Sequence, residues 1–202
     1  MNKSSSMVRG FGVKGMDYPT WENGKHTKEY QLWQNMLERC TEKWQAKNAS
    51  YKGVSCSENF KSYTFFYEWC HSQKGFNCKD DNGENWRLDK DILVKGNKVY
   101  SEDACCFVPL TVNSLLISRR AKRGDCPIGV YWDKSQSKFK SQCNVGTGVQ
   151  KHLGVYATKE DAFKSYKTFK EAQIRLVTEQ YKHQLDPRAY QALMNYQVEI
   201  TD

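Results

Sequence analysis

The sequence of 202 residues lacks any long apolar run. A transmembrane helix needs about 20 consecutive apolar residues, whereas the runs here, such as the one from Cys105 to Leu110, are only a few residues long. The first residues, MNKSSSMVRGFGVKGMDYP, also contain no apolar stretch of the signal-peptide kind. We therefore expect no contact with a membrane and a soluble protein of the cytoplasm.

The sequence also lacks the cysteine spacing of a zinc knuckle, because none of its eight cysteines forms a Cys-x-x-Cys pair. Disulfide-rich secreted domains are shorter than this chain and carry an export signal. Free thiols in a reducing compartment are therefore the favoured interpretation. A structural metal ion on scattered cysteines and histidines is the alternative that stays open.

Acidic residues are scarce in one part of the chain. The net charge is +8, and between Arg119 and Lys170 there are 12 basic and 4 acidic residues, so the rest of the chain is balanced. A basic segment in a balanced chain is typical of proteins that bind a polyanion such as nucleic acid. An ordinary solvated surface is the alternative explanation of the same composition.

Two amphipathic helices are predicted in the N-terminal half, over 27–40 and 57–73, where aromatic residues recur at helical spacing. Thr27 is placed to cap the first of them. Residues 1–26 are rich in glycine and serine and have few apolar anchors, so we expect a loosely ordered lead-in. We assign 27–118 to one domain.

A cluster of basic residues follows this domain in the segment ISRRAKRGDCP. The cluster precedes a glycine and a proline, which predicts a basic linker over 119–127. We expect the linker to contact DNA through its four clustered cations, Arg119, Arg120, Lys122 and Arg123.

The residue pattern changes over 128–202, which we assign to a second domain. Three short aromatic or β-branched runs are separated by polar turns and predict strands at 128–132, 138–145 and 151–156. A helix is predicted from about Lys159, with Thr158 as its cap, and a short helix from Asp186.

Alternation along the second predicted strand separates two kinds of side chain. Lys138, Lys140 and Gln142 share one face, and Phe139, Ser141 and Cys143 share the other, which we expect to face the helix. A polar and basic sheet face backed by an apolar one suits the DNA major groove, which admits a narrow β-ribbon.

The segments GVYW, KFKSQC and HLGVYATKEDAFKSY resemble, in this order, the AP2/integrase-type DNA-binding domain over about 45 residues. The matching positions are Leu153, Gly154, Tyr156, Thr158, Glu160, Ala162 and Tyr166. The spacing between the acidic residue and the alanine departs from the family pattern by one residue, in the run Glu160-Asp161-Ala162. The resemblance implies a three-stranded antiparallel sheet, packed on a helix, that reads the major groove. It implies contacts with double-stranded DNA from Tyr131, Lys138, Lys140, Gln142 and Lys151.

The stretch from Trp86 to Leu115 resembles the core of HNH (ββα-metal) nucleases. LDKDIL matches the first strand, CCFVP the second strand and LTVNSLL the helix. The resemblance implies a divalent metal ion, Mg²⁺ or Mn²⁺, held by Asp89 and Asn113. Asp91 is a candidate second ligand or weak base.

This stretch departs from the HNH pattern at two positions. Lys90 stands where the family has its histidine base, and Ala104 stands near the expected middle asparagine. An ammonium with a pKa of about 10.4 is a poor base at neutral pH, so His71 is an alternative. The candidate catalytic group is Asp89, Lys90, Asp91 and Asn113. Whether Lys90 or the two aspartates take the catalytic face stays open.

The order of an HNH-like part and an AP2-like part resembles the free-standing endonucleases of bacteriophages and mobile elements. The predicted fold class is α+β, with N-terminal helices, an HNH-like ββα core and an AP2-like sheet on a helix. The implied function is a site-selective, metal-dependent DNA endonuclease. The alternatives are a catalytically inactive DNA-binding regulator on the same scaffold and a protein that interacts with a nucleoprotein.

Overall fold

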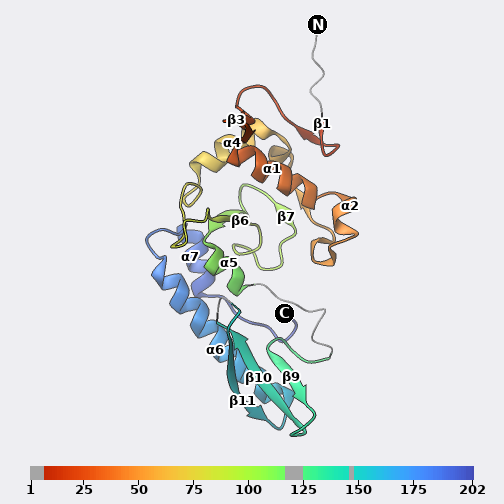
Figure 1. The fold of residues 1–202 in the computed structure, drawn as a ribbon, viewed down its shortest axis with the longest axis vertical. Helices are drawn as coiled ribbons and strands as arrows, with labels where there is room; N and C mark the ends of the chain where they lie inside the picture. The colour runs from red at the N-terminus through yellow and green to blue at the C-terminus, as the bar shows by residue number, and fades with distance from the viewer. Residues whose placement is uncertain (1–6, 117–124, 146–147) are drawn as a thin grey trace. The chain divides into compact units, whose positions relative to one another are not determined.

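A computed structural model of the chain describes residues 7–116, 125–145 and 148–202 (Figure 1). The architecture is mixed α+β, with several small two-stranded sheets and one three-stranded antiparallel sheet, so the predicted fold class is confirmed at this level. Within the described residues no helix is both long enough and apolar enough to cross a membrane.

The chain divides into two compact units. The first consists of Met1–Lys79 and Asn85–Val108, and the second of Asp80–Glu84 and Pro109–Asp202. The division falls between Val108 and Pro109, before the basic linker at which we expected it.

The helices of the first unit pack through aromatic faces. Thr27 caps α1 as predicted, since its side chain accepts a hydrogen bond from the Tyr30 amide. The expected second helix over 57–73 is broken at Ser62, whose side chain caps a new helix. The helices are α1 (Lys28–Arg39), α2 (Glu42–Gln45), the 3₁₀ helix η1 (Ala49–Tyr51), α3 (Glu58–Lys61) and α4 (Tyr63–Ser72).

Residues 7–26 form two short hairpins, where we had expected a loosely ordered lead-in. The Tyr63 hydroxyl donates to the Pro19 carbonyl at 2.8 Å, and the Tyr18 and Tyr67 rings stack at 3.9 Å. These contacts from α4 anchor the segment even though it has few apolar residues of its own. The hairpins pair β1 (Met7–Val8) with β2 (Gly12–Val13) and β3 (Trp21–Glu22) with β4 (Lys25–His26).

Two strand pairs complete the first unit. The strand β5 (Ser55–Cys56) pairs in parallel with β7 (Val99–Tyr100). The strand β6 (Arg87–Asp89) pairs antiparallel with β8 (Cys106–Val108), which corresponds to the two strands expected from LDKDIL and CCFVP. The first of these strands ends at Asp89, so Lys90 and Asp91, which LDKDIL placed in the expected strand, follow it in a turn.

The second unit contains the predicted three-stranded sheet and helix. The strand order is β11-β10-β9, all antiparallel, and α6 packs on one face of the sheet through Ala162, Phe163 and Tyr166. Thr158 caps α6 and Asp186 caps α7, as predicted. The elements are α5 (Leu110–Leu115), β9 (Val130–Asp133), β10 (Lys138–Asn144), β11 (Gln150–Tyr156), α6 (Lys159–Gln180) and α7 (Pro187–Met194).

Candidate nucleic-acid interface and candidate metal site

The three-stranded sheet has one face covered by α6 and one open face. Ser141 and Cys143 of β10 are buried, and Cys143 belongs to the core that includes α6 side chains. Lys138, Lys140 and Gln142 alternate with them and therefore lie on the open face. The alternation along this strand had predicted the separation of the two faces.

The neighbouring strands add two side chains to the open face. Tyr131 of β9 lies opposite Lys140, and His152 of β11 lies opposite Gln142. Tyr131 is 38% exposed, and His152 and Lys138 are exposed as well. His152 was one of the basic residues that stand out along the predicted strands, but it was not among the expected DNA contacts.

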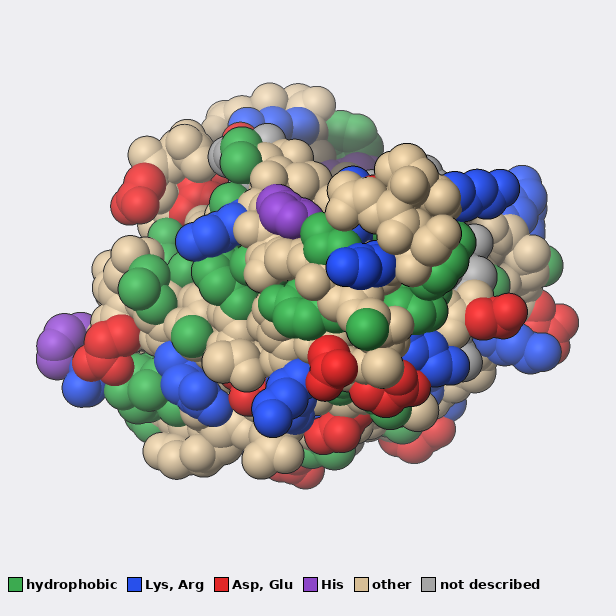
Figure 2. Space-filling view, turned by 90° about the horizontal axis from the view of Figure 1, so that it is seen from below, with side chains coloured by type: hydrophobic (Ala, Val, Ile, Leu, Met, Phe, Trp, Pro, Cys, Tyr) green, Lys and Arg blue, Asp and Glu red, His purple; other side chains and the backbone are tan. Residues whose placement is uncertain are grey.

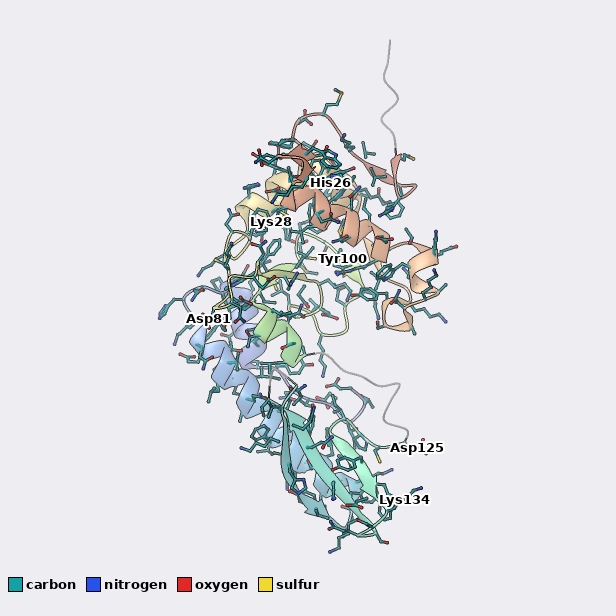
Figure 3. The ribbon with its side chains drawn as sticks, in the orientation of Figure 1. His26, Lys28, Asp81, Tyr100, Asp125 and Lys134 are labelled. Atoms are coloured by element: carbon teal, nitrogen blue, oxygen red, sulfur yellow. The ribbon has the colours of Figure 1, made fainter. Side chains whose placement is uncertain are left out.

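Lys140 lies in an ion pair with Asp133, on the open face of the sheet. This contact, together with hydrogen bonds from Ser135, holds the pKa of the Asp133 carboxyl well below its usual range. Ser135 donates to Asp133 Oδ1 from both its amide, at 2.8 Å, and its hydroxyl, at 2.6 Å. Asp133 thus organises the turn between β9 and β10, on which Lys134 is labelled in Figure 3, and orients Lys140.

Lys151 lies on the α6 side of the sheet. The resemblance had implied that it contacts DNA together with Lys138, Lys140 and Gln142, which lie on the open face. Lys151 pairs with the buried Cys143, and its Nζ lies 4.7 Å from the centre of the Phe169 ring of α6. The cause is an irregularity in the pairing: Ser141 lies opposite Gly154, but Gln142 lies opposite His152. The extra residue in β11 turns His152 outward in place of Lys151.

The four cations of the basic linker, Arg119, Arg120, Lys122 and Arg123, lie outside the described residues. Figure 2 shows one face of the molecule, on which lysine and arginine side chains are scattered among hydrophobic and polar ones. The candidate interface is therefore defined by the register of the sheet rather than by a dense basic patch on that face.

The candidate metal site centres on a tight turn after β6. Asp89 Oδ1 accepts hydrogen bonds from the amides of Asp91, at 2.8 Å, and Ile92, at 2.9 Å. Burial of the Asp89 carboxyl raises its pKa to about 7, and the nearby carboxylate of Asp91 adds to this effect. A hard divalent cation prefers oxygen donors, and two neighbouring carboxylates supply them. The cation would also offset the repulsion between the two negative charges.

Lys90 is buried beside these carboxylates, with 9% of its surface exposed. Its Nζ lies 3.1 Å from Asp91 Oδ2 and 5.9 Å from the centre of the Tyr100 ring, which is labelled in Figure 3. The Asn97 side chain donates to the Lys90 carbonyl at 2.6 Å and holds the turn in place. Lys90 is therefore a charge partner of Asp91 in this arrangement.

The other candidate groups belong to other elements of the structure. Asn113 is on α5 and belongs to the second unit, whereas Asp89, Lys90 and Asp91 belong to the first. His71 pairs with Glu29, its Nε2 lying 3.0 Å from Glu29 Oε1. Ala104 is buried. Among the residues that the structure describes, no group of three or more His, Cys, Asp or Glu side chains could hold a metal ion.

The carboxylate oxygens of Asp89 and Asp91 are of the kind that binds a hard divalent cation. The turn supplies only these two carboxylates, and Lys90 forms an ion pair with that of Asp91. No family model matches the chain, and no curated protein or solved structure matches it either. The assignment of function therefore rests on the residues and their geometry.

Proposed function

We propose that this protein binds double-stranded DNA through the open face of the sheet formed by β9, β10 and β11. The observation that carries the proposal is the register of this sheet, which gathers Tyr131, Lys138, Gln142 and His152 on the face that α6 leaves uncovered. Donors, acceptors and an aromatic ring on a narrow β-surface suit the edges of bases in the major groove.

The charge distribution supports the same proposal. The stretch from Arg119 to Lys170 has a net charge of +8 and includes both the linker and the sheet. Cations of this kind contact phosphates and position a protein on DNA, while groups such as Gln142 discriminate between bases. The basic linker then supplies affinity and the sheet supplies sequence preference.

We further propose that the protein is a metal-dependent endonuclease, and the carboxylate pair in the turn after β6 favours this second function. Asp89 and Asp91 would hold a Mg²⁺ or Mn²⁺ ion through their carboxylate oxygens. The ion would stabilise the charge that develops on phosphate oxygens. Lys90, in its ion pair with Asp91, orients that carboxylate and does not activate water.

A cleavage assay on a mixed DNA library tests both proposals. The parent protein is compared with an Asp89→Ala variant, each with Mg²⁺ or Mn²⁺ and with EDTA. We expect metal-dependent cuts at preferred sites that Asp89→Ala abolishes. Asp81→Ala, which removes an exposed carboxylate outside the turn, is the matched control and should cut like the parent.

The other outcomes identify the alternative functions. Site-selective binding without cutting in any condition would contradict the nuclease and leave a DNA-binding regulator. Absence of salt-sensitive binding to any DNA would contradict both proposals and favour a protein that interacts with a nucleoprotein.

A further inference from the structure

Two cysteines of the first unit lie side by side. Cys40 is the C-cap residue of α1, and Cys56 lies in β5. Both are free and partly exposed, and they lie close enough for each thiol to shift the pKa of the other. The other partly exposed cysteines, Cys78 and Cys126, offer a comparison within the same chain.

The backbone around this pair is held by contacts that do not involve the thiols. The Gln45 side chain donates to the carbonyl of Arg39 at 3.3 Å and to that of Val54 at 2.7 Å, and so joins the end of α1 to the start of β5. Arg39 also donates to the Tyr100 hydroxyl at 3.1 Å, and Tyr100 is the residue paired with Cys56. The two cysteines are thus brought together by the fold.

The surroundings distinguish the two thiols chemically. The neighbouring Cys40 thiol lowers the pKa of Cys56, and the positive charge of Lys61 acts in the same direction. The Cys56 thiol and burial raise the pKa of Cys40. Because the thiolate is the reactive form of cysteine, these opposite shifts favour Cys56 as the nucleophile of the pair and Cys40 as its partner thiol.

We propose that Cys40 and Cys56 form a redox site that a hydroperoxide oxidises reversibly to a disulfide. The Cys56 thiolate attacks the terminal oxygen of hydrogen peroxide, the O–O bond breaks, and hydroxide leaves to give a sulfenic acid. Cys40 then loses its proton and attacks Cys56 Sγ, and the displaced hydroxide leaves with that proton as water. Two electrons pass from the thiols to the peroxide, and a dithiol reductant reverses the change.

Peptide mapping of the reduced full-length protein after exposure to hydrogen peroxide tests this proposal. We expect a linked Cys40–Cys56 peptide to accumulate at least about tenfold faster than the thiols of Cys78 and Cys126 are lost, because Cys40 lowers the pKa of Cys56 and lies beside it to resolve its sulfenic acid. Dithiothreitol should restore the free thiols. Cys78→Ser serves as the matched control and should leave the rate of linkage unchanged.

Two variants separate the roles within the pair. Cys40→Ser should stop the reaction at the sulfenic acid of Cys56, which dimedone labels, whereas Cys56→Ser should leave Cys40 unlabelled. Loss of all eight thiols at similar rates, or linkage of other cysteines before Cys40 and Cys56, would overturn the proposal. The measurement on the parent protein needs no substitution, so a variant that fails to fold does not remove the test.

Discussion

At the scale of single residues, the turn after β6 combines a structural and a chemical role in one side chain. Asp89 caps the turn by accepting two amide hydrogen bonds, while burial and the neighbouring Asp91 raise its pKa to about 7. A buried carboxylate beside a second one destabilises the folded state when both are charged. Bound divalent metal would relieve that repulsion, which is why the pair supports a catalytic interpretation.

The raised pKa predicts how stability depends on pH. An unfolded aspartate titrates near 3.9, so the folded protein binds the proton of Asp89 more tightly, and this contribution to stability is lost as pH rises from about 4 to about 7. Asp89→Asn keeps an oxygen for the two amides and removes the charge. We expect the variant to gain stability over the parent by about 1–2 kcal/mol at pH 8, because some contact with water weakens the full effect.

Denaturant unfolding of both proteins from pH 4 to pH 8, without divalent metal, checks this prediction. The gain of the variant should shrink as the pH falls through this range. Asp81→Asn controls for the loss of an exposed carboxylate. A constant difference between Asp89→Asn and the parent at all pH values would show that the Asp89 pKa is not raised in the folded protein.

At the scale of secondary-structure elements, the β-bulge in β11 decides which side chains reach the open face of the sheet. The extra residue places His152 opposite Gln142 and turns Lys151 toward α6. A basic residue on the helix side can stabilise the core contact with Phe169 but is poorly placed to read bases. The two positions therefore have different expected roles although they are adjacent in sequence.

Alanine substitutions on the two faces of the sheet should affect DNA binding differently. Gln142→Ala should relax discrimination at one base pair by about 1–3 kcal/mol, because it removes a contact with a base edge. Lys151→Ala is the matched control and should leave site preference unchanged. Binding measured on a panel of single-base variants of the preferred site distinguishes these outcomes, and a loss of preference with Lys151→Ala would contradict the assigned face.

The entry to β9 requires a glycine. Gly129 has a φ of +75°, and a Cβ at this position would overlap the Tyr166 ring of α6. We expect Gly129→Ala to lower the free energy of unfolding by about 2–4 kcal/mol, from backbone strain and displacement of the ring. Gly148→Ala has a similar φ of +82° with open space around the new methyl group, so it should cost only about 1 kcal/mol. Equal costs in thermal or denaturant unfolding would rule out the packing component.

At the scale of the whole molecule, the chain consists of two units with different expected tasks. The first contains the candidate carboxylate turn and the thiol pair, and the second contains the candidate DNA-binding sheet. The strands of the HNH-like stretch belong to the first unit, while its expected helix, α5, belongs to the second. The excess of positive charge lies between Arg119 and Lys170 and so falls in the second unit.

The linker cations should act on DNA affinity without regard to sequence. Replacement of Arg119 and Arg120 by alanine removes two expected phosphate contacts, so the slope of log affinity against log salt should become shallower by about 2. Affinity for specific and non-specific DNA should fall alike. Fluorescence anisotropy over a range of salt concentrations measures both, and a selective loss of specific binding would contradict this role.

Much of the local structure could be predicted from the sequence because its signals are local. Thr27, Thr158 and Asp186 cap helices where the sequence indicated, and the alternation in β10 separates buried from open positions as expected. The hairpin of β3 and β4 also had a local signal, the Asn23-Gly24 turn in which both residues have positive φ. That dipeptide is a strong hairpin signal, and we missed it among the glycines of the N-terminal segment.

The sequence by itself determined the helix caps at Thr27, Thr158 and Asp186, the strands of the three-stranded sheet and the placement of charge, because caps, periodicity and composition act between residues close together in the chain. The tertiary structure alone decided which groups meet. The ion pair of Lys90 with Asp91, the outward turn of His152 and the raised pKa of Asp89 depend on how the chain turns, pairs and buries its residues in three dimensions. The contact between Cys40 and Cys56 likewise requires α1 and β5 to be held together by Gln45. No spacing in the sequence encodes the pairing of His152 with Gln142 or the approach of Cys40 to Cys56, because these contacts form between segments that folding brings together.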